Sequence, residues 1–192
     1  MKEAVLERPK EKVWTYEDYL HSTDEGRYEL INGRLEKMPA PSPYHQAILR
    51  ELGFILFKFV KESGLGEIFY APVDVVLDSH TVVQPDVVFI AKERMNMINY
   101  DRGIFGVPDL IVEIVSRGSF VRDKIEKFKM YERFGVKEYW IVYPGERAVE
   151  VWVLKDGKYE LHSVAEGEGK VRSEVLKGLK VEVGEVFKDL AE

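Results

Sequence analysis

The chain has 192 residues, 45% of them hydrophobic and 12% aromatic, which is enough for one well-packed domain and short for two. Its formal charge of −6 disfavours a protein that coats nucleic acid by bulk electrostatics. The absence of cysteine excludes disulfides and thiolate metal sites, and the four histidines lack the spacing of a zinc cluster, so that any metal would be hard and bound by oxygen. We expect a single domain over residues 1–192, with residues 1–14 as a loose arm.

The N-terminal part predicts a short helix followed by a hairpin. Thr15 is a candidate N-cap, with Asp18 three residues later in a near capping box. Two alternating segments within residues 28–38 are joined by Asn32-Gly33, a dipeptide that accepts the positive φ angles of a type I′ turn. We therefore expect a helix from about residue 15 and then two antiparallel strands.

Apolar periodicity predicts two longer helices, over residues 44–63 and 122–135, which end at Gly64 and Gly135. Alternating or continuous β-rich runs predict strands over 67–78, 82–91, 109–116, 138–144, 148–154 and 159–164. Residues 92–106 are expected to form a polar loop. Strands on both sides of two helices predict an α/β or α+β fold with a mixed sheet core flanked by helices.

No segment predicts a membrane span. The longest apolar run, "FILFKFV" at residues 54–60, contains Lys58 and is far shorter than the roughly 18 residues that cross a bilayer. Met1 is not followed by the pattern of a signal peptide. We expect a soluble, cytoplasmic protein with no membrane partner.

Two carboxylates stand in or at the end of apolar strands. Glu113 lies inside "PDLIVEIVS" (108–116), and Asp86 opens the apolar part of "QPDVVFI" (84–90). Burying an unpaired carboxylate costs several kcal/mol. Either acid alone could cap a turn or pair with an arginine, but the two together favour a site that holds a cation.

Two lysines of the second helix could reach these carboxylates, because that helix directly follows the strand of Glu113. A projection at about 100° per residue puts Lys124 and Lys127 inside the apolar arc. The apolar arc itself consists of Ile125, Phe128, Tyr131 and Phe134. A lysine that extends along apolar surface into solvent is the alternative for each, and the projection leaves both lysines open.

His45 and Glu29 are weaker candidates. His45 lies on the face of the first helix that carries Ile48 and Leu52, one turn before the core begins, where a structural histidine is also common. Glu29 shares a strand face with Ile31 and could point to the site or to solvent.

Two strand carboxylates and an inward lysine suit phosphodiester hydrolysis assisted by a divalent ion. Carboxylates hold Mg²⁺ while it keeps several waters, and the ion polarises a phosphoryl oxygen and activates a water. A lysine can then orient that water or offset charge on the phosphate.

Several segments, in this order and spacing, resemble the Uma-two family of restriction-endonuclease-like proteins, a branch of the PD-(D/E)XK nuclease superfamily. The segments are "YELINGRL", "PSPYHQ", "PVDVVLD", "VVQPDVVFI", "GVPDLIVEIVS", "RDKIEKFKMYERFGVKEYWIV" and "VEVWVL". The resemblance runs from about Tyr16 to about Val183 and implies a restriction-endonuclease-like fold that acts on DNA.

The resemblance also implies roles for individual residues. Asp86 and Glu113 would bind Mg²⁺ or Mn²⁺. The superfamily pattern places its lysine two residues after the second acid, where this chain has Val115, and the resemblance instead assigns that role to Lys127. Two further catalytic candidates on the same basis are Glu29 and His45.

Three functions compete at this point. The first is a Mg²⁺-dependent DNA endonuclease, for which a homodimer is a reasonable expectation because cutting both strands usually needs two sites. The second is a non-enzymatic module that keeps the nuclease fold to bind nucleic acid or protein, which the acidic composition favours. The third is a hydrolase of a smaller phosphoester. Between residues 117 and 133, six basic residues against three acids could seat a phosphate backbone, although ordinary helix-surface charge would look the same.

Overall fold

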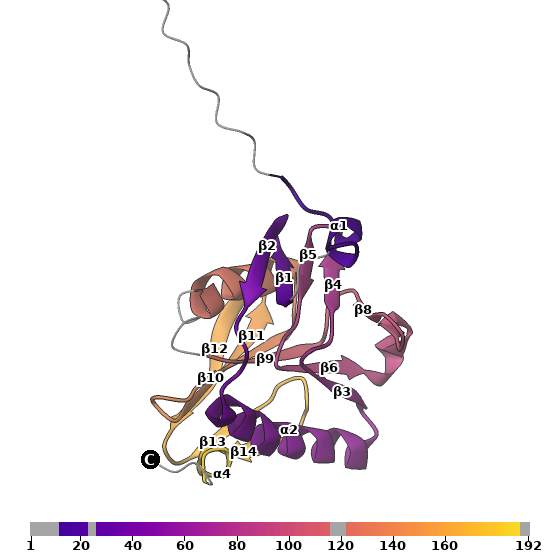
Figure 1. The fold of residues 1–192 in the computed structure, drawn as a ribbon. Coiled ribbons are helices and arrows are strands. Elements are labelled where there is room, and N and C mark those ends of the chain that lie inside the picture. Colours follow the sequence, from indigo (N-terminus) through magenta and orange to yellow (C-terminus); the bar gives the residue numbers. More distant parts are fainter. Residues whose placement is uncertain (1–11, 23–25, 116–121, 189–192) are drawn as a thin grey trace, which may run out of the picture.

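The computed structural model describes residues 12–22, 26–115 and 122–188, with the backbone alone at residues 122–124 (Figure 1). Its first six-stranded sheet has the order β2-β1-β5-β4-β8-β7, with β1 (Arg27–Ile31), β2 (Arg34–Met38), β4 (Val75–Asp78), β5 (Thr81–Val83), β7 (Ile98–Asn99) and β8 (Gly103–Phe105). The second six-stranded sheet has the order β12-β11-β10-β9-β6-β3, with β3 (Gly66–Tyr70), β6 (Val87–Ala91), β9 (Leu110–Ile114), β10 (Glu138–Tyr143), β11 (Ala148–Lys155) and β12 (Lys158–Glu166). A small third sheet pairs β13 (Lys170–Arg172) with β14 (Lys180–Glu182). The predicted mixed α+β architecture is confirmed.

The helices are α1 (Tyr16–Leu20), α2 (Pro43–Ser63), a 3₁₀ helix η1 (Lys92–Met97), a π helix η2 (Arg122–Lys127), α3 (Phe128–Phe134) and α4 (Val183–Val186). The predicted capping box is present, because Asp18 Oδ2 accepts a hydrogen bond from Thr15 N at 2.9 Å. The hairpin turn between β1 and β2 is also confirmed, with positive φ angles at Asn32 and Gly33. None of the helices in the described ranges is both long and apolar enough to cross a membrane.

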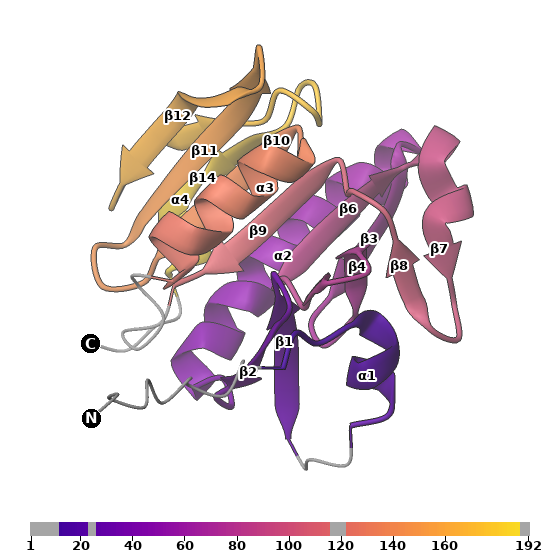
Figure 2. The same cartoon turned by 90° about the horizontal axis from the view of Figure 1, so that it is seen from above.

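Helices cover both faces of the second sheet, with α2 on one face and α3 on the other (Figures 1 and 2). The α2 face packs Leu52 and Leu56 against Val112 and Trp140, in a cluster that α4 completes. The α3 face forms a separate cluster of buried residues, which includes Ile111, Val115, Met130, Tyr131 and Tyr139. Alternation along β9 therefore directs Glu113, which lies between Val112 and Ile114, to the α3 face.

The chain crosses between the two large sheets at two prolines, which corrects two predicted strands. Residues 67–78 form not one strand but β3 and β4, which lie in different sheets and are separated by Pro72. Residues 82–91 likewise divide into β5 and β6 around Pro85. Proline has no N–H to donate to a strand ladder, so pairing stops at these positions. As a result β1, which pairs with β5, lies close to the start of β6.

The segment predicted as a polar loop, residues 92–106, contains η1 and the short hairpin of β7 and β8. Strands of two and three residues are too short to show a periodic pattern, so the prediction of a loop was wrong.

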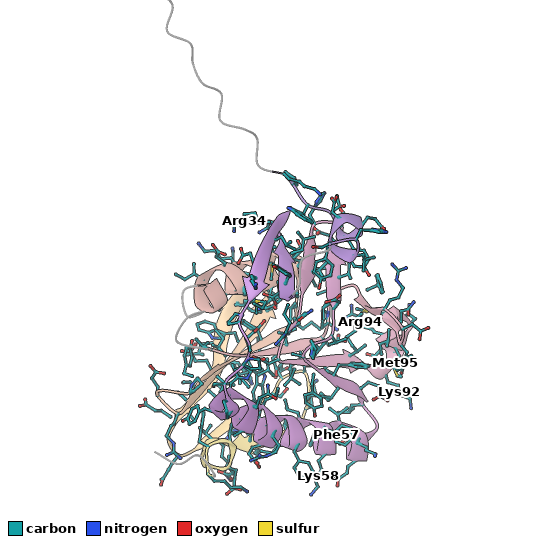
Figure 3. The ribbon with its side chains drawn as sticks, in the orientation of Figure 1. Arg34, Phe57, Lys58, Lys92, Arg94 and Met95 are labelled. Atoms are coloured by element: carbon teal, nitrogen blue, oxygen red, sulfur yellow. The ribbon has the colours of Figure 1, made fainter. Side chains whose placement is uncertain are left out.

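Asp109, which directly precedes β9, forms hydrogen bonds with residues of three neighbouring segments. Its Oδ1 accepts hydrogen bonds from Arg94 Nη1 and Lys137 Nζ, each at 2.7 Å, and its Oδ2 accepts one from Ala91 N at 3.0 Å. Arg94 is labelled in Figure 3. Burial alone raises the pKa of the Asp109 carboxyl, but the hydrogen bonds from Lys137, Ala91 and Arg94 together hold that pKa below its ordinary value.

Asp109→Asn is expected to lower the free energy of unfolding at pH 7 by about 1–3 kcal/mol, because the hydrogen bonds from Arg94 and Lys137 lose their charged acceptor. A folded-state pKa below the unfolded one gives stability that is complete above the unfolded pKa of about 4 and is lost as the pH falls through the folded-state pKa. Urea unfolding of wild type and variant should therefore differ more at pH 7 than at pH 3. A difference that stays constant with pH would contradict this role.

Candidate active site

Asp86 lies where the chain passes from the first large sheet into the second. The pairing of Val87 with Val112 in antiparallel β6 and β9, extended by one residue, places Asp86 opposite Glu113. Asp86 Oδ2 also accepts a hydrogen bond from Ile114 N at 2.7 Å. The two strand carboxylates picked out in the sequence therefore occupy neighbouring positions in the sheet.

Glu113 is buried with two donors on one of its oxygens. Its side chain is 6% exposed. Its Oε1 accepts hydrogen bonds from Lys127 Nζ and from the hydroxyl of Tyr131, both at 2.8 Å. These donors offset the cost of burying a carboxylate in an apolar strand.

Lys127 is fully buried between carboxylates from the two large sheets. Its Nζ lies 2.8 Å from Glu113 Oε1 and 2.9 Å from Glu29 Oε1. Both contacts are charge-assisted hydrogen bonds, the stronger class of such bonds in proteins. The lysine therefore joins β1 of one sheet to β9 of the other.

Lys127 is placed by a π-helical turn that precedes α3. Lys127 is the last residue of η2, in which hydrogen bonds span five residues, and α3 follows directly. A uniform projection at 100° per residue put Ile125 in the apolar arc, but Ile125 is 50% exposed. That prediction was wrong because the wider π turn advances each side chain by a smaller angle. Lys124, the other candidate lysine, has a side chain outside the described part of the structure.

Glu29 points into the protein rather than to solvent. It is completely buried, and its Oε1 accepts hydrogen bonds from Lys127 Nζ and from Gln84 N, both at 2.9 Å. Its Oε2 is also buried and has no hydrogen-bond partner among the described residues. Because Gln84 lies two residues before Asp86, Glu29 contacts both the lysine and the segment that carries the first acid.

His45 reaches Asp86 from the first turn of α2. Its Nε2 lies 3.1 Å from Asp86 Oδ2, a distance that fits a hydrogen bond donated by a protonated Nε2. The His45 side chain is 14% exposed, and its buried Nδ1 has no hydrogen-bond partner within the described ranges. The structure thus brings His45 against the predicted metal-binding acid.

Tyr131 also contacts Glu113, although the sequence pattern indicates only an apolar position for it. Burial, reinforced by the negative charges of Glu113 and Glu29, raises the pKa of the Tyr131 phenol well above its ordinary value. The phenol therefore stays protonated and can donate to Glu113. The available signal was its spacing, because residues four apart on a helix share a face and Tyr131 lies four residues after Lys127.

Comparisons with known proteins agree with this geometry. A family model described as "Uma2: Putative restriction endonuclease" matches residues 15–184. The chain belongs to this family. A solved structure, a "putative nuclease belonging to DUF820 from Anabaena variabilis ATCC 29413", is similar with a TM-score of 0.74 and 20% identity, over 91% of this chain and 97% of that chain. No curated protein matched.

Membership of the Uma2 family confirms the resemblance drawn from the sequence segments, and the solved structure confirms the nuclease-like fold. Family and fold together support a nuclease function in general terms. The identity of the substrate and the dependence on a metal are finer questions, which depend on the chemistry of the site.

The residues present fit a hard divalent cation better than a soft one. The site offers hard oxygen ligands, because Asp86 lies opposite Glu113 when the pairing of β6 with β9 is extended by one residue, and the ammonium group of Lys127 contacts Glu113 and Glu29. In the part of the chain that the structure describes, no three side chains of His, Cys, Asp or Glu are grouped closely enough to hold a metal. An ion held by Asp86 and Glu113 would therefore need several water ligands, which is the usual arrangement for Mg²⁺.

The basic stretch from residue 117 to residue 133 lies partly outside the described residues. Within the described part, Lys127 is buried and so contributes nothing to a charged surface. Arg133 Nη2 donates a hydrogen bond to Asn32 Oδ1 at 2.7 Å, and Lys129 is exposed. A surface that could seat a phosphate backbone is therefore less basic here than the residue count predicted.

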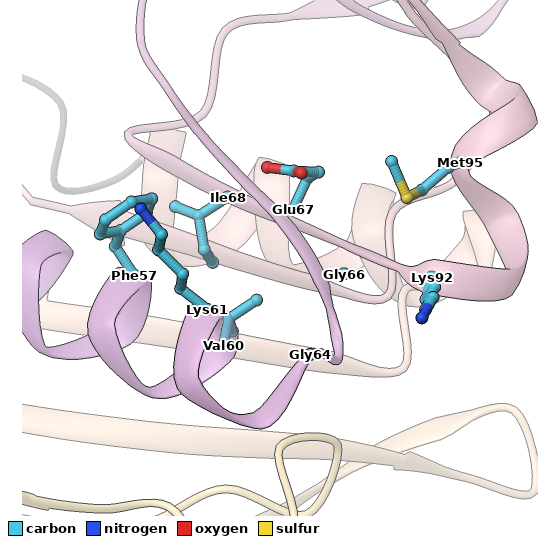
Figure 4. A pocket seen from close by; sticks show the side chains of 9 residues that line it. All are labelled: Phe57, Val60, Lys61, Gly64, Gly66, Glu67, Ile68, Lys92 and Met95. Carbon is cyan, nitrogen blue, oxygen red and sulfur yellow. The ribbon is translucent and has the colours of Figure 1, made fainter.

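A pocket of about 400 Å³ lies between α2, β3 and η1 (Figure 4). Phe57 and Lys61 of α2, Glu67 of β3 and Lys92 of η1 are among its lining residues. Lys92 directly follows β6, whereas Asp86 directly precedes it. The pocket and the candidate site therefore lie at opposite ends of this strand.

Proposed function

We propose that the chain is a metal-dependent endonuclease that hydrolyses phosphodiester bonds in DNA, with Mg²⁺ or Mn²⁺ as its cofactor. One observation carries the proposal: Lys127 Nζ lies 2.8 Å from Glu113 Oε1 in β9, and Asp86 directly precedes the neighbouring strand β6. Two strand carboxylates and a lysine are the groups that metal-assisted hydrolysis of a phosphodiester requires.

Each residue has a part in this proposal. Bound Mg²⁺ or Mn²⁺ would supply Lewis acidity toward the phosphate and lower the pKa of an attacking water. Asp86 and Glu113 would hold the ion, and Lys127 would offset negative charge that develops on the phosphate. Glu29 would act through Lys127, and His45 would act through Asp86, because these are the groups that they contact.

The proposal extends to substrate, assembly and location. DNA is the substrate, and the protein acts in the cytoplasm as one domain that spans the whole chain. Cleavage of both strands of a duplex usually needs two active sites, so the proposal includes a homodimer as the active species.

The direct test incubates supercoiled and linear DNA with the protein and Mg²⁺ or Mn²⁺. Wild type should convert supercoiled DNA to nicked and linear forms, and excess chelator should stop the reaction. Asp86→Ala should be inactive under the same conditions. Cleavage that survives either the chelator or the substitution would refute the proposed site.

A non-enzymatic binding module is the second candidate, and the net charge of −6 favours it over an enzyme that must approach a polyanion. It predicts no cleavage with either metal but retained binding to nucleic acid or protein. Hydrolysis of a small phosphodiester without any cleavage of DNA would indicate the third function, a hydrolase of smaller phosphoesters.

A further inference from the structure

The hydroxyl of Tyr131 has no part in the function proposed above, although it lies at the centre of the site. It donates to Glu113 Oε1 at 2.8 Å, and the same oxygen accepts a hydrogen bond from Lys127 Nζ at 2.8 Å. The tyrosine is completely buried, and its ring packs edge-on against Tyr139 with 5.1 Å between ring centroids. Packing therefore fixes the position from which the hydroxyl donates.

Two donors on one oxygen determine how the Glu113 carboxylate is rotated. The terminal torsion of a glutamate is broad, so packing of the side chain alone defines the plane of the carboxylate poorly. Hydrogen bonds from Lys127 and Tyr131, which lie one helical turn apart, restrict that rotation from two directions. A carboxylate with a defined plane presents its oxygens to a cation without a further loss of conformational entropy.

The two donors differ in how they would behave during the proposed reaction. The ammonium group of Lys127 is shared with Glu29 and would turn toward the phosphate as charge develops there. The hydrogen bond from Tyr131 to this oxygen would persist while Lys127 turns away. Without that hydroxyl, the movement of Lys127 would weaken the support of a buried carboxylate.

We infer that Tyr131 is a positioning residue, which holds Glu113 in the orientation that binds the divalent ion, independently of Lys127. This inference rests on the proposed function, because it assumes that Glu113 is a metal ligand. Tyr131 would not bind the metal as Asp86 and Glu113 do, nor contact the phosphate as Lys127 does. It would act only through the carboxylate of Glu113.

The test compares Mn²⁺ binding by calorimetry in wild type and Tyr131→Phe, which keeps the ring and removes the donor. We expect about 10-fold weaker binding, the lower end of the range for losing a hydrogen bond to a metal ligand. With DNA as substrate, kcat should fall by a similar factor while KM stays within about twofold of wild type, because Tyr131 would not contact the substrate.

Tyr159→Phe is the matched control. Tyr159 is also buried on the α3 face, and its hydroxyl donates to Val136 O at 2.9 Å, away from the site carboxylates. Both variants lose one buried hydrogen bond, so they should show similar decreases in melting temperature. Only Tyr131→Phe should bind Mn²⁺ more weakly.

A second replacement keeps the test decisive if Tyr131→Phe does not fold. A para-aminophenylalanine at position 131 retains a donor at the end of the ring and should restore Mn²⁺ binding to near the wild-type level. Failure of this rescue, equal weakening in both phenylalanine variants, or unchanged binding in Tyr131→Phe would each overturn the inference while leaving the proposed function in place. Absence of Mn²⁺ binding by wild type would overturn both.

Discussion

Lys127→Met is expected to lower the free energy of unfolding by about 3–5 kcal/mol, because it leaves two buried carboxylates without their shared cation. Glu29 and Glu113 are the carboxylates concerned, at 2.9 and 2.8 Å from the ammonium nitrogen. Methionine keeps the length and apolar bulk of the lysine stem, so that the loss reports on charge rather than on a cavity. Urea unfolding at pH 7 measures the change.

The same variant should cleave DNA on the order of 10²-fold more slowly or worse, the scale for removing one electrostatic group from a transition state. Lys129→Met is the matched control, because Lys129 lies two residues later, in α3, and is exposed. The control should change stability by less than about 0.5 kcal/mol and keep most of the activity. Equal losses of stability and of cleavage rate in the two variants would show that Lys127 has no special role at the site.

A double variant separates unbalanced charge from other causes. Glu29→Gln removes one of the two carboxylates that Lys127 contacts. Added to Lys127→Met, it should restore part of the lost stability, with an interaction energy of about 0.5–3 kcal/mol between the two changes. Simple additivity would show that the buried ion pair is not the source of the loss.

The features predicted correctly from the sequence depend on residues close together in the chain. The Asn32-Gly33 turn and the capping box of Thr15 and Asp18 are set by local hydrogen bonds and backbone preferences, and both are present in the structure. Glu113 stands out in the sequence because a charged residue interrupts an apolar strand, which is again a local pattern. These signals do not require knowledge of which strands pair.

The division of the strands between two sheets could not be predicted in this way. Pro72 marks a break within residues 67–78, but nothing local assigns the two halves to different sheets, since both read as strands. Only the partners differ, because β3 pairs with β6 whereas β4 pairs with β5. The pairing of β1 with β5 is distant in sequence, and it places β1, which carries Glu29, next to the segment that leads to Asp86.

The contacts of Lys127 and Tyr131 with Glu113 could not be predicted from the sequence, for separate physical reasons. A projection at a constant angle assumes an α helix, whereas Lys127 ends a π turn. Tyr131 combines an apolar ring with a polar hydroxyl, so a pattern of apolar positions counts the ring and ignores the donor. Both departures from local patterns occur at the same few residues, as is common where a site departs from local rules.

Asp86→Asn is expected to abolish metal binding while changing the stability of the metal-free protein by less than about 1 kcal/mol. The carboxylate of Asp86 accepts hydrogen bonds from Ile114 N and from His45, and the amide oxygen of asparagine can accept the same bonds. The substitution also removes one negative charge from a site where Glu113 lies at the neighbouring position. In the metal-free protein, any weakening of these hydrogen bonds is offset by the reduced repulsion from Glu113, so the free energy of unfolding changes little. The large effect is the loss of metal binding.

Thermal unfolding with and without Mn²⁺ measures both quantities in one experiment. At a concentration 100 times its Kd, Mn²⁺ should stabilise wild type by about 2.7 kcal/mol and should not stabilise Asp86→Asn. Asp101→Asn, at an exposed aspartate in the turn between β7 and β8, should respond to Mn²⁺ as wild type does. A carboxylate that forms an ion pair stabilises the fold at all times, whereas a metal ligand stabilises it only when the cation is bound. A large loss of stability in metal-free Asp86→Asn would therefore indicate that Asp86 is a structural partner of His45 and not a metal ligand.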